Sequence, residues 1–322
     1  MNKTLFSVGI VGVLAAPAAS LADTTLYGNI RWTVGQFDAG TSTVMAVNNA
    51  SRVGLKGSIG EKGGITGIYH LQMGANADGN GNTGTGGGST ALTDRFYFGG
   101  IKGGFGTILY GRASSPYKMA GLKLDPFYDT SAGPLNGGSN YGFSSLTNGF
   151  FNNVLAYVSP KIGGGLTFNA VAVIDDGPTD DHAYNVGAAW SGNGITVGAQ
   201  MISAEPAVFA LDTAMRVHAG YKTAGWSAGI SWENVDNGTV DGDFINVSGT
   251  FNVGPGKIAA SYGTVDGSLT GARNAPGAGY SVGYFHKLAK KTEARLIYSS
   301  VDYDAGGPAD RDVVGLMFIQ SF

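Results

Sequence analysis

Cysteine is absent from the 322 residues of this chain. Its absence excludes a disulfide-linked scaffold, a metal site with cysteine ligands and catalysis by a thiol. A chain that crosses an oxidising compartment also avoids wrong disulfide bridges when it has no cysteine.

Charged side chains are scarce. Asp, Glu, Lys and Arg make up 13% of the sequence, against about 25% in ordinary soluble domains. The formal net charge of −3 disfavours binding to nucleic acid or attachment to an anionic membrane surface. Hydrophobic residues nevertheless reach 43%, and 55 residues are glycine. The composition therefore indicates a folded chain, not a disordered one, with an unusually apolar surface.

Long apolar runs are also missing, apart from one short stretch near the start. Residues 5–16 are apolar and follow Lys3, but the stretch is too short for a membrane-spanning helix. Small residues come before the bond between Ala22 and Asp23. This pattern predicts a signal peptide over 1–22 that is cleaved at that bond. Because only helices and closed barrels satisfy the backbone in lipid, a mature chain that spans a membrane would have to be a barrel.

Apolar and polar residues alternate with period two along much of the chain, which predicts β-strands. One face of the first segment carries Leu26, Ile30, Trp32 and Val34, and the other carries Asn29, Arg31 and Thr33. Further along, Phe96 and Phe98 alternate with Arg95 and Tyr97. Alternation alone does not separate a half-buried soluble strand from a strand that faces lipid.

The breaks between these segments fall into two classes. Seven are short and rich in Gly or Lys: 60–64, 102–106, 161–165, 191–194, 222–225, 252–256 and 287–291. Eight are longer and polar: 37–50, 75–92, 113–150, 175–182, 204–212, 235–242, 265–277 and 303–310. Fifteen connections that alternate in this way join about sixteen strands, with both ends on the short-turn side. The sequence therefore predicts an all-β fold: one domain over 23–322 that forms an antiparallel transmembrane β-barrel.

Four segments of the chain are DTTLYGNI at 23–30, SRVGLKG at 51–57, DRFYFGGIKGGFGTILYGR at 94–112 and NNVLAYVSPKIGGGLTF at 152–168, and the last residue is Phe322. In their order and in the terminal Phe they resemble segments of the Gram-negative, neisserial-type general porins. The resemblance implies a sixteen-stranded outer-membrane barrel, usually a homotrimer, for passive diffusion of small hydrophilic solutes, with no cofactor. It also implies contact with outer-membrane lipid, and assembly by the barrel assembly machinery with Phe322 as the signal.

The resemblance also implies a constriction. In these porins the third long loop folds into the lumen, presents acidic groups and faces basic groups on the wall. Here that loop is 113–150. The corresponding candidates are Asp125 and Asp129 on the loop, Arg31, Arg52, Lys56 and Arg95 on the lumen face of the wall, and Arg112 at the root of the loop. Phe150 stands where the family often has an arginine, which weakens the expected basic cluster.

Two other functions stay open at this point: a plugged barrel with a structural or adhesive role, and a barrel enzyme. Local motifs give little support to either. A GxGxxG match at 79–84 lies in a Gly/Asn/Thr-rich loop with no helical pattern after it, so it does not predict a nucleotide site. The four histidines are dispersed and do not predict a zinc site. We therefore expect no catalytic, cofactor or metal residues.

Overall fold

The computed structural model describes residues 24–76, 92–132, 140–174, 182–205 and 210–322, so the expected signal peptide and its cleavage point lie outside the described residues. The described part contains one helix, α1 (Pro116–Leu122), and seventeen strands. The strands are β1 (Thr25–Asp38), β2 (Ser42–Asn48), β3 (Arg52–Lys62), β4 (Ile65–Ala75), β5 (Leu92–Gly103), β6 (Gly106–Ala113), β7 (Phe151–Val158), β8 (Leu166–Val173), β9 (Ala183–Gly192), β10 (Ile195–Ala204), β11 (Thr213–Lys222), β12 (Trp226–Asp236), β13 (Asp241–Val253), β14 (Gly256–Gly267), β15 (Gly277–Ala289), β16 (Thr292–Tyr303) and β17 (Arg311–Ser321).

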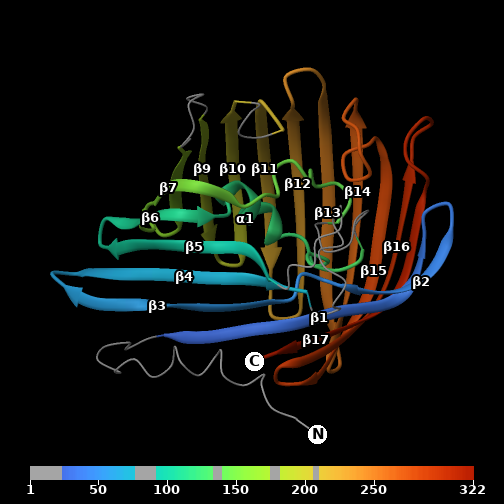
Figure 1. Ribbon diagram of the computed structural model, residues 1–322, viewed down its shortest axis with the longest axis horizontal. Coiled ribbons are helices and arrows are strands. Elements are labelled where there is room, and N and C mark those ends of the chain that lie inside the picture. The colour runs from blue at the N-terminus through green and yellow to red at the C-terminus, as the bar shows by residue number, and fades with distance from the viewer. Residues whose placement is uncertain (1–23, 77–91, 133–139, 175–181, 206–209) are drawn as a thin grey trace, which may run out of the picture.

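All of these strands belong to one antiparallel sheet that closes on itself (Figure 1). Each strand from β3 to β17 pairs with the next one, and β17 pairs with β1 from Asn29–Ser321 to Asp38–Asp312. Both β2 and β3 pair with β1, one beyond the other, so they are two halves of a single strand of the barrel. The closed barrel therefore has sixteen strands, as predicted.

The prediction of a long loop over 37–50 is wrong. The chain turns within residues 39–41, where Gly40 has φ of +80° and its N–H donates to Asp38 Oδ1 at 3.1 Å. Residues 42–48 then form β2, whose backbone pairs with β1 from Ser42 to Asn48 and whose middle, 44–47, is apolar. The interruption between β2 and β3 is short, and Ala50 there has φ of +58°.

The seven predicted short turns are confirmed. The turn between β9 and β10, for example, is Asn193–Gly194 with φ of +51° and +82°, a conformation that Asn-Gly sequences favour in two-residue hairpins. Ser321 N–H donates to the carbonyl of Lys291, in the turn between β15 and β16, at 2.8 Å, and Ser321 also pairs with Asn29 near the start of β1. The described ends of the barrel therefore lie on the short-turn side. The predicted loops 75–92, 175–182 and 204–212 fall largely outside the described residues.

The two faces of the strands differ as the alternation predicts. On β1 the large apolar side chains of Leu26, Ile30, Trp32 and Val34 are exposed, whereas Thr33 between them is buried. An apolar outer face with an inner face of mixed polarity is the arrangement of a barrel in lipid. Within the described residues, no helix is long and apolar enough to cross a membrane.

The alternation of Phe96 and Phe98 with Arg95 predicts that they lie on the opposite face of the strand from Arg95, and this prediction is wrong. The register between β4 and β5 shifts at Gln72–Met73, and the additional residue on β5 at that point is Arg95. Such a bulge puts Arg95 and Phe96 on the same side of the sheet. The ring of Phe96 stacks on that of His70 with centroids 4.8 Å apart, and Phe98 meets the same ring edge-on.

The connection between β6 and β7 folds inside the barrel, as predicted for the third long loop. It begins with α1, whose N-terminus is capped by Ser115 Oγ, which accepts from Lys118 N–H at 3.1 Å. The helix contacts β9, β10 and β11, and it lies within the ring of strands in Figure 1. Tyr117, Phe127 and Tyr141 of this connection are almost completely buried. We call the described part of this connection, residues 114–132 and 140–150, the inner loop.

Candidate functional site

A buried ion pair fastens the start and the end of the inner loop to one wall. Arg216 of β11 and Glu233 of β12 are 2.6 Å apart, and both side chains are at least 97% buried. Arg216 also donates to the Tyr117 carbonyl at 2.8 Å. Glu233 accepts from Ser144 N–H at 3.1 Å and from the Thr147 hydroxyl at 2.7 Å. The two buried charges are therefore compensated by hydrogen bonds to the loop as well as by the ion pair itself.

The middle of the inner loop is fastened to strands β13 to β16. Asn246 donates to the Tyr141 carbonyl at 2.8 Å, and Ser281 donates to Asn140 Oδ1 at 2.9 Å. The loop backbone lies so close to β14 that a Cβ atom added at Gly263 would be 2.0 Å from the Tyr141 carbonyl oxygen. Glycine at this position is required by that close approach.

On the opposite side, Asp129 of the inner loop meets two arginines of the first strands. Arg31 Nη1 of β1 donates to Asp129 Oδ2 at 3.0 Å, and Arg52 of β3 forms an ion pair with the same oxygen. The Asp129 side chain is 4% exposed and its backbone has φ of +57°, so the loop holds it in one orientation. The inner loop thus contacts both the first strands and strands β9 to β16.

Three further cations gather around the ring of Phe150. The distances to the ring centroid are 3.9 Å from Lys118 Nζ, 4.7 Å from Arg95 Cζ and 5.9 Å from Arg112 Cζ. The ring of Phe96 also packs against this ring at nearly a right angle, with the two ring centroids 5.1 Å apart. Cations are attracted to the face of an aromatic ring, so Phe150 holds together groups that repel each other.

Hydrogen bonds orient the two arginines of this group. Arg95 Nε donates to Gln72 Oε1 at 2.7 Å, and Arg112 Nη1 donates to Asn152 Oδ1 at 2.7 Å. Arg112 lies at the end of β6, next to the root of the loop, as its sequence position indicates.

Electrostatics link these groups into one basic cluster, defined as Arg31, Arg52, Arg95, Arg112 and Lys118. The charge of Lys118 interacts with the charges of Arg95, Arg52 and Arg112 as well as with that of Asp129. The charge of Arg31 likewise interacts with those of Arg52 and Arg95. Burial, and then the neighbouring arginines, lower the pKa of Lys118 on α1 to about 7. Asp129 is the carboxylate that forms ion pairs with this cluster in the described residues, so the cluster carries an excess of positive charge.

The other two candidates lie elsewhere. Asp125 is buried within the loop, where its oxygens accept from the N–H groups of Phe127 and Asn140, each at 2.8 Å. Burial raises the pKa of Asp125 to about 6. Lys56 is exposed in the middle of β3, and its ammonium lies 5.0 Å from the ring centroid of Tyr27. Neither forms an ion pair with the basic cluster or with Asp129 among the described residues.

Sequence reasoning missed Lys118, the favourable role of Phe150 and the Arg216–Glu233 pair. Lys118 lies in the predicted loop, but no local pattern marks its direction. Arg216 and Glu233 have the parity of inward residues on adjacent strands, which is a signal that could have paired them. No group of His, Asp or Glu within the described residues is arranged to hold a metal ion.

Comparison with known proteins agrees with this architecture. The family model described as Gram-negative porin matches residues 9–306. The major outer membrane protein P.IB of Neisseria gonorrhoeae is 27% identical over 206 residues, which are 60% of this chain and 55% of that protein. The alignment thus spans about half the length of this curated relative.

Solved structures share the fold. An anion-selective porin from Comamonas acidovorans superposes with a TM-score of 0.73 at 18% identity, covering 93% of this chain and 99% of the other. OmpT of Vibrio cholerae in a trimer form superposes with a TM-score of 0.66 at 15% identity, covering 93% and 99%. With a sixteen-stranded barrel, an inner loop and a family match over most of its length, the chain belongs to the Gram-negative porin family and is a protein of the outer membrane.

Proposed function

We propose that the protein is a porin, a water-filled channel for passive diffusion of ions and small hydrophilic solutes, and that the basic cluster and Asp129 form its constriction. The observation that carries the proposal is an inner loop that crosses from strands β9–β16 to the arginines of β1 and β3 inside a closed barrel. Fixed charges at a narrow point bias the passage of ions through local potential, without tight binding. The excess of positive charge favours anions.

Reconstitution into a planar bilayer tests the channel. We expect stepwise, ohmic conductance in KCl, and a reversal potential in a KCl gradient that shows anion preference. A pure, folded protein that never conducts would contradict the proposal. Conductance that appears only after residues of the inner loop are deleted would instead support a plugged barrel.

A charge reversal tests the constriction. Replacing Arg52 and Arg95 together by Glu should move the reversal potential toward cation preference. Lys290 and Lys291 are exposed in the turn between β15 and β16, so Lys290→Glu with Lys291→Glu makes the same change in net charge away from the cluster. An equal shift in both double variants would show that the cluster is not the selective region.

The assembly is proposed to be a homotrimer in outer-membrane lipid, on the model of the trimeric neighbour. Phe322 continues the pairing of β17 with β1, because its N–H donates to the Gly28 carbonyl at 3.1 Å. A role for Phe322 as a signal to the barrel assembly machinery stays a prediction. Membership of a porin family favours a channel over an enzyme.

A further inference from the structure

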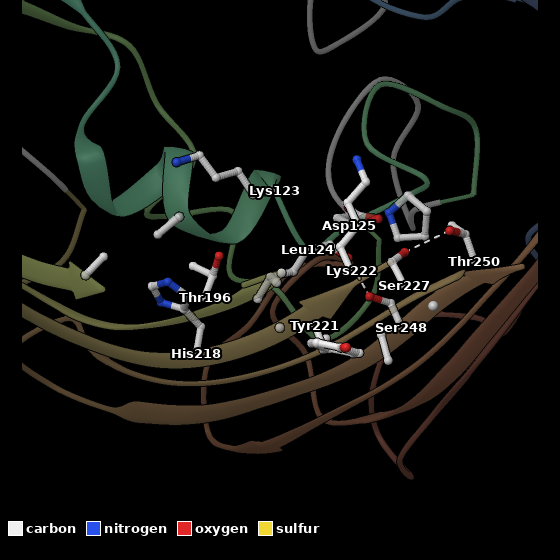
Figure 2. A pocket seen from close by; sticks show the side chains of 18 of the residues that line it. Lys123, Leu124, Asp125, Thr196, His218, Tyr221, Lys222, Ser227, Ser248 and Thr250 are labelled. Atoms are coloured by element: carbon white, nitrogen blue, oxygen red, sulfur yellow. Dashed lines mark hydrogen bonds between the residues drawn. The ribbon is translucent and has the colours of Figure 1, made fainter. Parts of the chain in front are cut away.

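A second charged region lies on the other side of the inner loop, toward the short turns. There the structure contains a hollow of about 790 Å³ between the loop and the inner wall (Figure 2). Its wall reaches the turns that follow β9 and β11, at Gly194 and Thr223. The volume is within the usual range for small-molecule sites. Arg31, Arg52, Arg95 and Asp129 do not line it.

The charges around this hollow are mostly positive. Lys123 comes from the loop, Lys222 from the end of β11 and Lys257 from β14. None of these lysines has a carboxylate within ion-pair distance among the described residues. Among the described residues of the lining the one acidic residue is Asp125, whose oxygens accept hydrogen bonds from backbone N–H groups of the loop.

Two buried polar atoms at the hollow lack hydrogen-bond partners in the described part of the chain. They are Nδ1 of His218 and Oδ1 of Asn169. His218 is 7% exposed, and its ring rises from β11 beneath α1 in Figure 2. A buried polar group without a partner is costly, so such atoms mark places where a ligand or water completes the hydrogen bonding.

The loop side of the hollow is apolar. Met119, Leu124 and Pro126 line it, and the Met119 side chain is 40% exposed even though it lies on a helix inside the barrel. Exposed apolar groups next to lysines match a ligand with an apolar body and a negative group.

Resting on the proposed channel function, we propose that this hollow binds small organic carboxylates with an apolar body, such as an aromatic monocarboxylate. The carboxylate lies between Lys222 and Lys257, and the apolar body lies against Leu124 and Met119. His218 lies at the α1 end of the hollow, away from Lys222. The site holds such solutes on the short-turn side of the constriction.

Benzoate, acetate and benzamide separate recognition of the carboxylate from recognition of the apolar body, because acetate lacks the ring and benzamide lacks the charge. At constant ionic strength, benzoate should lower the KCl conductance of the reconstituted channel at concentrations where acetate and benzamide do not. Lys222→Gln with Lys257→Gln should raise the half-blocking benzoate concentration about fivefold, because each partly exposed charge contributes modestly. Met119→Gln should reduce the preference of the channel for benzoate over acetate.

The control is Lys290→Gln with Lys291→Gln, which removes the same charge at the same end of the barrel but outside the hollow. Benzoate should block this variant at the same half-blocking concentration as the wild type. Titration calorimetry of benzoate into the detergent-solubilised protein measures the binding without any current. A protein that does not conduct would therefore contradict the proposed function, while calorimetry would still test whether the hollow binds benzoate. Equal affinity in the wild type and the Lys222/Lys257 double variant, or equal effects of benzoate and acetate, would overturn the site.

Discussion

A single aromatic ring organises the basic cluster. Phe150 contacts Lys118 and Arg95 through its ring, and Arg112 lies further out. Each cation–π contact contributes about 0.5–2 kcal/mol, depending on its exposure. The aromatic residue that stands in for a family arginine therefore does not remove positive charge from this region; it concentrates the charges around itself.

Replacing Phe150 by Arg should increase anion preference and lower stability, because a fourth cation takes the place of the ring that stabilises the other three. The expected loss is about 2 kcal/mol or more. A reversal potential in a KCl gradient and guanidinium unfolding from lipid vesicles check the two effects. Phe150→Leu is the matched control, since it loses the ring without adding charge and should change stability alone. An unchanged reversal potential in Phe150→Arg would place the ring away from the path of the ions.

The lowered pKa of Lys118 predicts that selectivity depends on pH. Below about pH 7 the ammonium is protonated and adds one charge to the cluster; above pH 7 it is neutral. Anion preference should therefore fall as the pH rises from 6 to 8. Reversal potentials across this range measure the change, and Lys118→Met should remove the step. A wild-type profile that is flat over the same range would show that Lys118 keeps one protonation state.

At the residue scale, parity and resemblance predicted part of the candidate site. Arg31 and Arg52 have inward parity, and the structure joins both to Asp129. Asp125 lies four residues earlier in the same acidic stretch but turns onto the backbone of its own loop. That difference depends on how an irregular loop folds on itself. The sequence of such a loop has no periodicity from which the direction of a side chain could be predicted.

At the element scale, the strands and short turns were largely predictable. Gly-rich pairs such as Asn193–Gly194 mark hairpins because they tolerate positive φ. The split of one strand into β2 and β3 was not predictable, because both short segments pair with β1 one beyond the other and no local pattern shows that they share one place in the barrel. The bulge at Arg95 was missed for a related reason, since one additional residue reverses the parity without changing the composition.

The inner loop depends on the Arg216–Glu233 pair for its position. Glu233→Ala leaves the buried guanidinium of Arg216 without its partner and frees Ser144 and Thr147, so we expect a loss of about 3–5 kcal/mol. Conductance should also become larger and noisier as the loop loosens. Thermal unfolding in detergent and single-channel recording measure both effects.

Glu293→Ala is the control, because Glu293 pairs with Arg295 through a more exposed side chain and should cost about 0–1 kcal/mol. Equal effects of the two variants would contradict a special role for the buried pair.

At the scale of the whole molecule, the outer apolar face determines where the barrel is stable. Leu316 lies in the middle of β17 and is 42% exposed, opposite Val34 across the strand pair that closes the barrel. Leu316→Arg puts a charge in lipid and should cost about 2–4 kcal/mol, whereas an arginine near the interface costs about 0–1 kcal/mol. Leu288, at the short-turn end of β15, provides that second position. Guanidinium unfolding from vesicles measures both variants, and equal losses would argue against Leu316 facing the lipid core.

The attachments of the inner loop also constrain the order in which the molecule can form. Its partners Arg216, Asn246 and Ser281 lie 99 to 141 residues further along the chain from the groups that they hold. Contacts between such distant residues form late, because a long segment must first be brought together. The loop therefore cannot take its final place until the strands around it have assembled. A nascent barrel that is still short of its last strands would have a wide, unobstructed interior, and the narrowing of the passage would be among the last features to mature.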